Sequence, residues 1–133
     1  MSERMIDHIS LNVADFAGME AFYAKALAPL GVKPMMKFGK EVTGGADVVG
    51  FGAEKPFFWL AGTERTRPAQ HIAFRAESRA EVDAFYAAAM AAGGTDNGKP
   101  GVREMYHPHY YGAFVLDPEG HNVEAVCHRA AGA

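Results

Sequence analysis

Apolar and polar residues alternate at two places in the chain, and a helical pattern follows each of them. Residues 5–13 read MIDHISLNV, with isoleucine, leucine and valine on one face and polar residues on the other, which predicts a half-buried strand. Apolar residues then recur at helical spacing after Asp15, a candidate N-cap. Residues 70–76 (QHIAFRA) repeat the alternation, and the next helix starts with Ser78 as its cap and Glu81 three residues later, as in a capping box.

The two strand-helix units are copies of each other. Residues 8–32 align without a gap with residues 71–95, and the matches include a His-Ile pair that opens each unit and an Ala-Phe-Tyr triplet in each helix. A polar linker, residues 61–69, separates the units. A unit that occurs twice predicts two similar modules related by pseudo-symmetry. This relation also places two histidines, His8 and His71, at equivalent points.

Further strands are expected after each helix. Residues 95–109, rich in glycine and proline, are expected to form loops, and the sequence Asp117-Pro118-Glu119-Gly120 is a turn. The expected strands cover residues 34–38, 47–52, 57–60, 110–117 and 121–127. We therefore expect one α+β domain over residues 1–133. Its two tandem βαβββ modules, about residues 4–62 and 69–129, would form a cupped mixed sheet with the helices on the outer face.

Composition narrows the class of protein. The net charge of −3 argues against nucleic acid as a partner, because phosphate binding needs clustered Lys and Arg. The chain has no apolar run long enough to cross a membrane and no signal-like start. The single cysteine, Cys127, excludes an internal disulfide and fits a reducing compartment, so we expect a cytoplasmic protein.

Two histidines and one glutamate are candidate metal ligands. His8 and His71 open the first strand of their modules on the face opposite the core residues. Glu124 lies in the middle of an apolar strand, where a carboxylate is costly to bury without a partner. Two imidazoles and a carboxylate suit a divalent metal with open positions for water or substrate. The alternative is that each is an ordinary structural or surface residue.

The segment 103–112 (REMYHPHYYG) concentrates two histidines, three tyrosines and an arginine before a strand. It could line the mouth of a cup with donors, acceptors and a general base, or it could be a surface loop whose aromatic rings pack on the sheet. For a functional loop, we expect His107 and Tyr110 to be catalytic. Trp59, Arg103, Tyr106 and Tyr111 would bind substrate. We expect His121 to be exposed and His128, near the tail, to have no role.

The chain resembles the vicinal oxygen chelate superfamily, which includes glyoxalase I, extradiol dioxygenases, methylmalonyl-CoA epimerases, fosfomycin resistance transferases and bleomycin-binding proteins. The matching segments are residues 6–9 (IDHI), 70–74 (QHIAF) and 113–126 (AFVLDPEGHNVEAV), and the resemblance covers nearly the whole chain. Around residues 106–111, the chain is similar to an uncharacterised bacterial glyoxalase-like subgroup.

The resemblance implies a ligand set. His8, His71 and Glu124 match three of the superfamily's metal-ligand positions, for a divalent Zn, Ni, Mn or Fe ion. The fourth position falls on Trp59, and an indole cannot ligate a metal. Glyoxalase I enzymes have Glu there and epimerases have Gln, so this departure speaks against both activities. A His-His-Glu set resembles extradiol dioxygenases and fosfomycin transferases.

Two functions remain open. The first is a metalloenzyme that polarises vicinal oxygens of a small-molecule substrate, as a lyase, isomerase or dioxygenase. The second is a metal-free binding protein of the bleomycin-resistance type, in which Trp59, Phe57 and the tyrosines stack on a flat ligand. The resemblance implies a homodimer. The sequence leaves open whether the site lies within one chain or across two.

Overall fold

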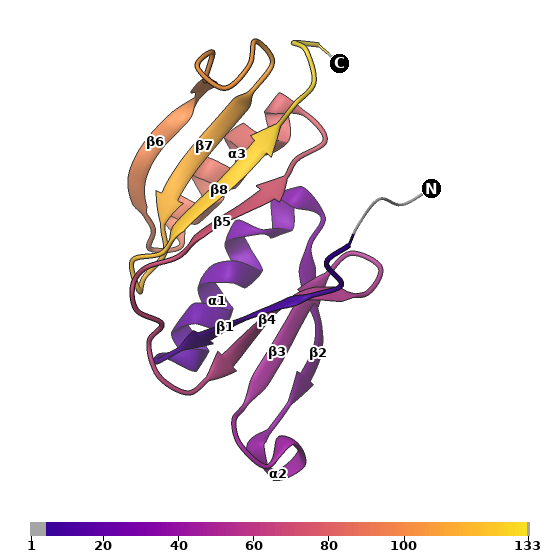
Figure 1. Ribbon diagram of the computed structural model, residues 1–133, viewed down its shortest axis with the longest axis vertical. Coiled ribbons are helices and arrows are strands. Elements are labelled where there is room, and N and C mark those ends of the chain that lie inside the picture. Colours follow the sequence, from indigo (N-terminus) through magenta and orange to yellow (C-terminus); the bar gives the residue numbers. More distant parts are fainter. Residues whose placement is uncertain (1–4, 133) are drawn as a thin grey trace.

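The structure, a computed structural model, describes residues 5–132, and two modules with the same order of elements make it up (Figure 1). The first module contains β1 (Ile9–Val13), α1 (Phe16–Ala26), the 3-10 helix η1 (Ala28–Leu30), β2 (Lys33–Phe38), α2 (Lys40–Thr43), β3 (Val48–Gly52) and β4 (Pro56–Gly62). The second contains β5 (His71–Arg75), α3 (Arg79–Ala91), β6 (Thr95–Val102), β7 (Tyr111–Leu116) and β8 (Asn122–Cys127).

Each module forms its own four-stranded mixed sheet. The strand orders are β1-β4-β3-β2 and β5-β8-β7-β6, so the last strand of each module lies beside the first. That pair, at one edge of each sheet, is parallel in both sheets, and the other neighbours are antiparallel. The predicted α+β fold of two tandem βαβββ modules is confirmed. The short helix α2 is an addition that the sequence pattern did not predict.

The two long helices begin where the sequence places their caps. The Asp15 carboxylate accepts a hydrogen bond from the Gly18 backbone N–H at 3.0 Å, and the Ser78 hydroxyl accepts one from the Glu81 N–H at 3.1 Å. These bonds satisfy backbone donors that have no partner within the first turn of a helix. The predicted N-termini of α1 and α3 are therefore confirmed.

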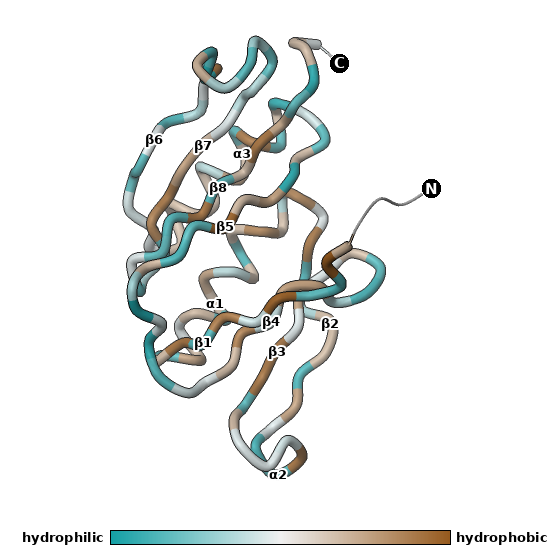
Figure 2. Tube along the Cα trace, viewed as in Figure 1, coloured by the Kyte–Doolittle hydropathy of each residue, from teal (hydrophilic) through white to brown (hydrophobic). Residues whose placement is uncertain are grey.

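The strand β6 corrects the expectation that residues 95–109 form loops. Its sequence, TDNGKPGV, lacks the alternation of a half-buried strand, and Figure 2 shows it mostly teal to white where β3 is largely brown. Pairing with β7 nevertheless makes it a strand, with register shifts on both sides of Gly98. Gly98 has φ of 153°, a conformation that favours glycine, and such an irregularity is typical of an edge strand.

The core lies between the helices and one face of each sheet. α1 contacts α3 and β4, and α3 packs on β7 and β8. The largest fully buried side chains include Phe22, Tyr23, Phe51, Phe58 and Phe85. The other face of each sheet is left without a helix. Among residues 5–132, no helix is long and apolar enough to span a membrane.

The turn between β7 and β8 connects the two modules. Asp117 accepts a hydrogen bond from the Tyr23 hydroxyl of α1 at 2.5 Å, and both groups are buried. Glu119 accepts from the backbone N–H groups of Ala14 and Asp15 at 2.9 and 2.8 Å, at the junction of β1 and α1. The turn therefore fixes the second module against the start of the first helix.

His121 belongs to the same junction, and the expectation that it is exposed is wrong. Its side chain is fully buried, and its Nδ1 accepts a hydrogen bond from the Gln70 backbone N–H at 2.9 Å. The bond ties the turn to the residue before β5. The polar turn sequence suggested exposure, but the turn packs inward because its side chains bind backbone groups from both modules.

Candidate active site

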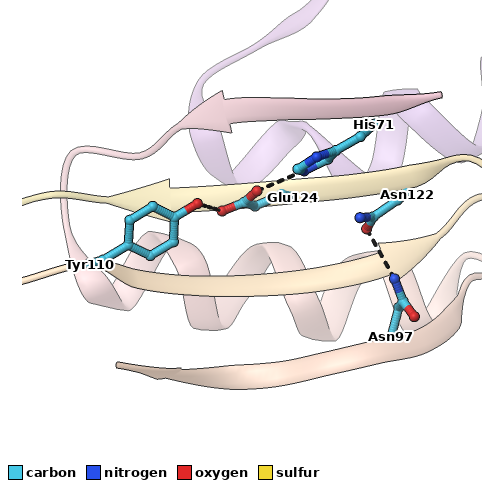
Figure 3. Close-up of polar contacts among 5 residues, drawn as sticks. All are labelled: His71, Asn97, Tyr110, Asn122 and Glu124. Carbon is cyan, nitrogen blue, oxygen red and sulfur yellow. Dashed lines mark hydrogen bonds and ion pairs between the residues drawn. The ribbon is translucent and has the colours of Figure 1, made fainter. Parts of the chain in front are cut away.

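Glu124 is the centre of a polar group on the open face of the second sheet (Figure 3). It lies in the middle of β8, only 1% exposed, between Ala73 of β5 and Phe114 of β7. One carboxylate oxygen is 2.8 Å from Nε2 of His71, and the other accepts a hydrogen bond from the Tyr110 hydroxyl. A buried carboxylate needs such partners, because removal from water is costly.

Local structure brings each partner to the carboxylate. His71 is the first residue of β5, which runs parallel to β8. Tyr110 ends the loop that precedes β7. Its ring reaches over the strand because Gly112, two residues later, has no side chain in the way. A Cβ atom at Gly112 would lie 3.2 Å from the Tyr110 ring and 3.3 Å from the Glu124 carboxylate. The glycine therefore provides the space for this contact.

The surroundings keep the Tyr110 phenol protonated. Burial, the hydrogen bond to Glu124 and the charge of that carboxylate together raise the pKa of Tyr110 well above its ordinary value. Each of these effects disfavours the phenolate. At neutral pH, Tyr110 is therefore a protonated hydrogen-bond donor to the Glu124 carboxylate.

A cleft of about 400 Å³ opens in front of this group. Its lining residues all belong to the second module: His71, Tyr106, His107, Tyr110, Phe114, Glu124 and His128. Aromatic rings and imidazoles form the walls, and the single carboxylate lies among them. Such a cleft fits a small molecule, with few polar groups to orient it.

Two histidines contact each other on the wall of the cleft. Nε2 of His107 lies 2.9 Å from Nδ1 of His128, and the rings are stacked. Nδ1 of His107 accepts a hydrogen bond from the His109 backbone N–H at 3.0 Å. A neutral His107 therefore carries its proton on Nε2, and it donates that proton to His128.

The chain matches a known sequence family over most of its length. The model of the Glyoxalase/Bleomycin resistance protein/Dioxygenase superfamily matches residues 5–125. The chain belongs to this superfamily. No curated protein sequence matches it.

Solved structures with the same fold come from several bacteria. A glyoxalase/bleomycin resistance protein from Albidiferax ferrireducens T118 is 25% identical, with a TM-score of 0.77 over 95% of this chain and 100% of that one. A glyoxalase/bleomycin resistance protein/dioxygenase family enzyme from Burkholderia phytofirmans PsJN is 18% identical, with a TM-score of 0.68 over 93% and 98% of the two chains. The fosfomycin resistance protein FosX of Listeria monocytogenes, solved as a complex with Mn(II) and sulfate ion, is 19% identical, with a TM-score of 0.66 over 100% and 95%.

For this superfamily member, the structure brings together two of the three predicted metal ligands, His71 and Glu124. His8 lies just before β1 in the other module, exposed, with its Nδ1 atom 2.6 Å from Asp7. Within a single chain, residues 5–132 contain no group of three His, Cys, Asp or Glu side chains that could hold a metal ion. A complete ligand set of the predicted type would therefore need the His8 side chain of a second copy of the chain.

The strand register supports the position assigned to Trp59. Trp59 of β4 lies opposite Ser10 of β1, as Glu124 of β8 lies opposite Ala73 of β5. Ser10 and Ala73 are equivalent positions of the repeat. Trp59 thus occupies the place of Glu124 in the first module, where its ring stacks on Phe38 at a centroid distance of 6.4 Å.

The predicted substrate-binding residues fall into different places. Tyr106 lines the cleft, and the Arg103 guanidinium lies 5.3 Å from the ring centroid of Phe114 beside it. Tyr111 does not line the cleft, because its hydroxyl donates to Asp83 of α3 at 2.7 Å.

His128 and Phe114 were not predicted as site residues. A signal for His128 exists, since residues 124, 126 and 128 alternate onto one face when β8 is extended toward the tail. Phe114 is the cross-strand neighbour of Glu124, which only the strand register reveals.

Proposed function

We propose that this chain is a cytoplasmic metal-dependent enzyme whose divalent cation binds His71 and Glu124 together with His8 of the partner subunit in a homodimer. The observation that carries the proposal is Glu124, a buried carboxylate that faces a cleft and contacts an imidazole nitrogen at 2.8 Å. Burial of a carboxylate costs free energy, and a buried titratable group in a cleft is typical of a functional site.

The donor set fits a divalent cation of the first transition row or zinc. His71 offers Nε2, and Glu124 offers a carboxylate oxygen from an adjacent strand. Imidazole nitrogen and carboxylate oxygen are usual ligands of Zn, Ni, Mn and Fe(II). The Mn(II) complex of FosX, a member of the same superfamily, supports this class of metal.

A second copy of the chain would supply the third ligand. His8 occupies the position in the first module that His71 occupies in the second, so pseudo-symmetry makes it the natural counterpart. Its side chain is 56% exposed, and apolar residues are exposed on β2 and β4 of the same module. They are Met36 at 49%, Phe38 at 40% and Phe57 at 37%. Burial of these residues against a partner would favour a dimer.

Side chains of the cleft would bind and orient a small substrate. The cation, when bound, would act as a Lewis acid on vicinal oxygens of that substrate. Tyr110 would donate a hydrogen bond to a substrate oxygen, since its raised pKa keeps the hydroxyl protonated. His107 would hold a proton at Nε2 toward His128, while Tyr106 and Phe114 would contact the substrate from the cleft wall. Lyase, isomerase and dioxygenase reactions are all compatible with these roles.

A metal-free binding protein of the bleomycin-resistance type is the second candidate. The observation that favours it is the stacking of Trp59 on Phe38, which gives the open face of the first sheet an aromatic surface for a flat ligand. In that case, the bonds of Glu124 to His71 and Tyr110 are permanent internal contacts.

Metal content separates the two functions. We expect protein purified without chelator, or incubated with Zn, Ni, Mn or Fe(II), to hold close to one metal ion per chain by elemental analysis. His71→Ala should remove most of this metal because it deletes a ligand. His109→Ala is the matched control, since its exposed side chain lies in the same loop as His107 and its backbone N–H is retained. Parent protein without metal after every incubation would leave the binding protein as the better hypothesis.

A further inference from the structure

The open face of the second sheet carries a row of residues that starts at the proposed metal site. Strand pairing places Ala73, Glu124, Phe114 and Gly98 side by side across β5, β8, β7 and β6. Glu124 and Gly98 are two strands apart, which corresponds to about 10 Å. The Phe114 ring lies between them and lines the cleft. Whatever lies over Gly98 is therefore within reach of a small molecule bound at Glu124.

The guanidinium of Arg103 lies over Gly98. Its two terminal nitrogens donate to the backbone carbonyls of Gly101 and Lys99, each at 2.8 Å, and its centre is 5.3 Å from the Phe114 ring centroid. A Cβ atom at Gly98 or Gly101 would lie 3.2 Å from the guanidinium. The glycines of β6, which break the strand pattern, therefore make the space that holds this cation in one orientation.

Among residues 5–132, no acidic group forms an ion pair with Arg103. In the part of the chain that the structure describes, no carboxylate oxygen lies within 4.0 Å of its guanidinium, although five basic side chains lie this close to a carboxylate. Two N–H groups bind carbonyls, and within residues 5–132 the others have no hydrogen-bond partner.

We propose that Arg103 binds the carboxylate of an anionic substrate. The cleft would then take a flat molecule that lies across Phe114, with an oxygen at His71 and Glu124 and a carboxylate about two strand spacings, roughly 10 Å, away at Arg103. A planar guanidinium with fixed orientation suits a planar carboxylate, and preorganisation lowers the cost of binding. The contact of a substrate oxygen with His71 and Glu124 rests on the proposed function. The contact of the substrate carboxylate depends on Arg103 alone.

The test compares an acid with its neutral amide. The probes are 4-hydroxycinnamate and 4-hydroxycinnamamide, which have the same ring and the same length. Titration calorimetry measures their affinities for the parent, Arg103→Gln and Arg103→Lys. The control is Arg129→Gln, because Arg129 is exposed and already pairs with Glu77 at 2.9 Å. The loop should keep its fold in the Arg103 variants, since the bond from the residue 103 N–H to the Tyr110 carbonyl (2.7 Å) belongs to the backbone.

We expect the parent and Arg129→Gln to bind the acid at least about tenfold tighter than the amide, as a charge-assisted hydrogen bond would give. Arg103→Gln should abolish this preference, and Arg103→Lys should keep part of it, because lysine keeps the charge but not the planar fork. Equal binding of acid and amide by the parent, an unchanged preference in Arg103→Gln, or no binding of the acid would each overturn the proposal.

The same titrations on metal-free protein and on His71→Ala keep this proposal distinct from the metal site. If the protein holds no metal but the acid is still preferred through Arg103, the proposed enzyme function fails and the carboxylate site stands. If metal binds to His71 but the acid is not preferred over the amide, the carboxylate site at Arg103 fails and the proposed metal site stands.

Discussion

At the scale of single residues, loss of the contact between Tyr110 and Glu124 should lower stability. Phenylalanine at position 110 would leave a carboxylate oxygen that is almost fully buried without its donor. An unsatisfied buried acceptor costs about 1–3 kcal/mol. We therefore predict that Tyr110→Phe lowers the free energy of unfolding of metal-free protein by about this amount, as measured by urea denaturation.

The matched control for this prediction is Tyr111→Phe. It removes the neighbouring tyrosine's hydroxyl, whose bond to Asp83 is exposed to solvent. Exposed hydrogen bonds contribute less because water replaces the lost partner, so this variant should lose about 1 kcal/mol or less. Equal losses in the free energy of unfolding for the two variants would show that the burial of Glu124 does not strengthen the contribution of its bond to Tyr110.

Individual site residues differ in how far the sequence predicted them. Glu124 and His71 could be predicted, because a carboxylate in an apolar strand and a repeated histidine are both recognisable in the amino-acid sequence. The bond between Tyr110 and Glu124 could not, since it depends on the path of the loop and on the space left at Gly112. The place of His128 in the cleft wall was not predicted, because its position near the tail outweighed its spacing from Glu124.

At the scale of elements, the bond between α1 and the turn after β7 should be visible in the pH dependence of stability. Burial and the nearby carboxylate of Asp117 raise the pKa of Tyr23 well above its ordinary value. A group with a raised pKa in the folded state contributes its full stability below the pKa of the unfolded chain and loses it as pH rises further. We predict that the free energy of unfolding falls above pH 10, by up to about 1.4 kcal/mol per pH unit from this residue.

Denaturation at a series of alkaline pH values measures this slope, and variants assign it. Tyr23→Phe should show a shallower decline than the parent above pH 10, although it is less stable at neutral pH because Asp117 loses a donor. Tyr106→Phe is the control, since Tyr106 is 60% exposed and makes no bond to Asp117. The same slope in all three proteins would contradict the assignment to Tyr23.

Elements with a clear periodicity were predicted correctly, and the failures share one cause. Both long helices have a 3.6-residue pattern and the first strand of each module has a 2-residue pattern, and most other strands are apolar runs between turn residues. The strand β6 has no such pattern, because glycine, proline and polar residues form most of it and its hydrogen bonds come from β7. The burial of His121 likewise depends on Gln70, far away in the sequence.

At the scale of the whole molecule, the question is where the site becomes complete. The repeat correctly predicted two similar modules, but local patterns do not fix their relative placement. That placement depends on contacts such as Glu119 with the start of α1, which join residues far apart in the sequence. In the resulting arrangement, the cleft is lined by the second module alone, and His8 lies outside it. This separation of His8 from His71 within one chain is what favours a site shared by two chains.

Mixing of two inactive variants tests a shared site directly. His8→Ala and Glu124→Gln homodimers should each bind little metal, because every site lacks one ligand. A heterodimer combines one site that lacks both ligands with one site that is intact, formed by the unaltered His8 of one chain and the unaltered Glu124 of the other. After subunit exchange of equal amounts, half of the dimers are mixed, so metal content should recover to about a quarter of the parent value.

A second mixture is the control that distinguishes a site completed by His8 of the other chain from a general effect of subunit exchange. Mixing of His71→Ala with Glu124→Gln should recover metal only if a chain could draw one of these ligands from its partner, and the 2.8 Å contact between them within one chain speaks against that. Elemental analysis of both mixtures after exchange gives the readout. Recovery in the His8 mixture alone would establish a site across two chains. Recovery in neither mixture, with subunit exchange verified, would mean that His8 does not complete the site.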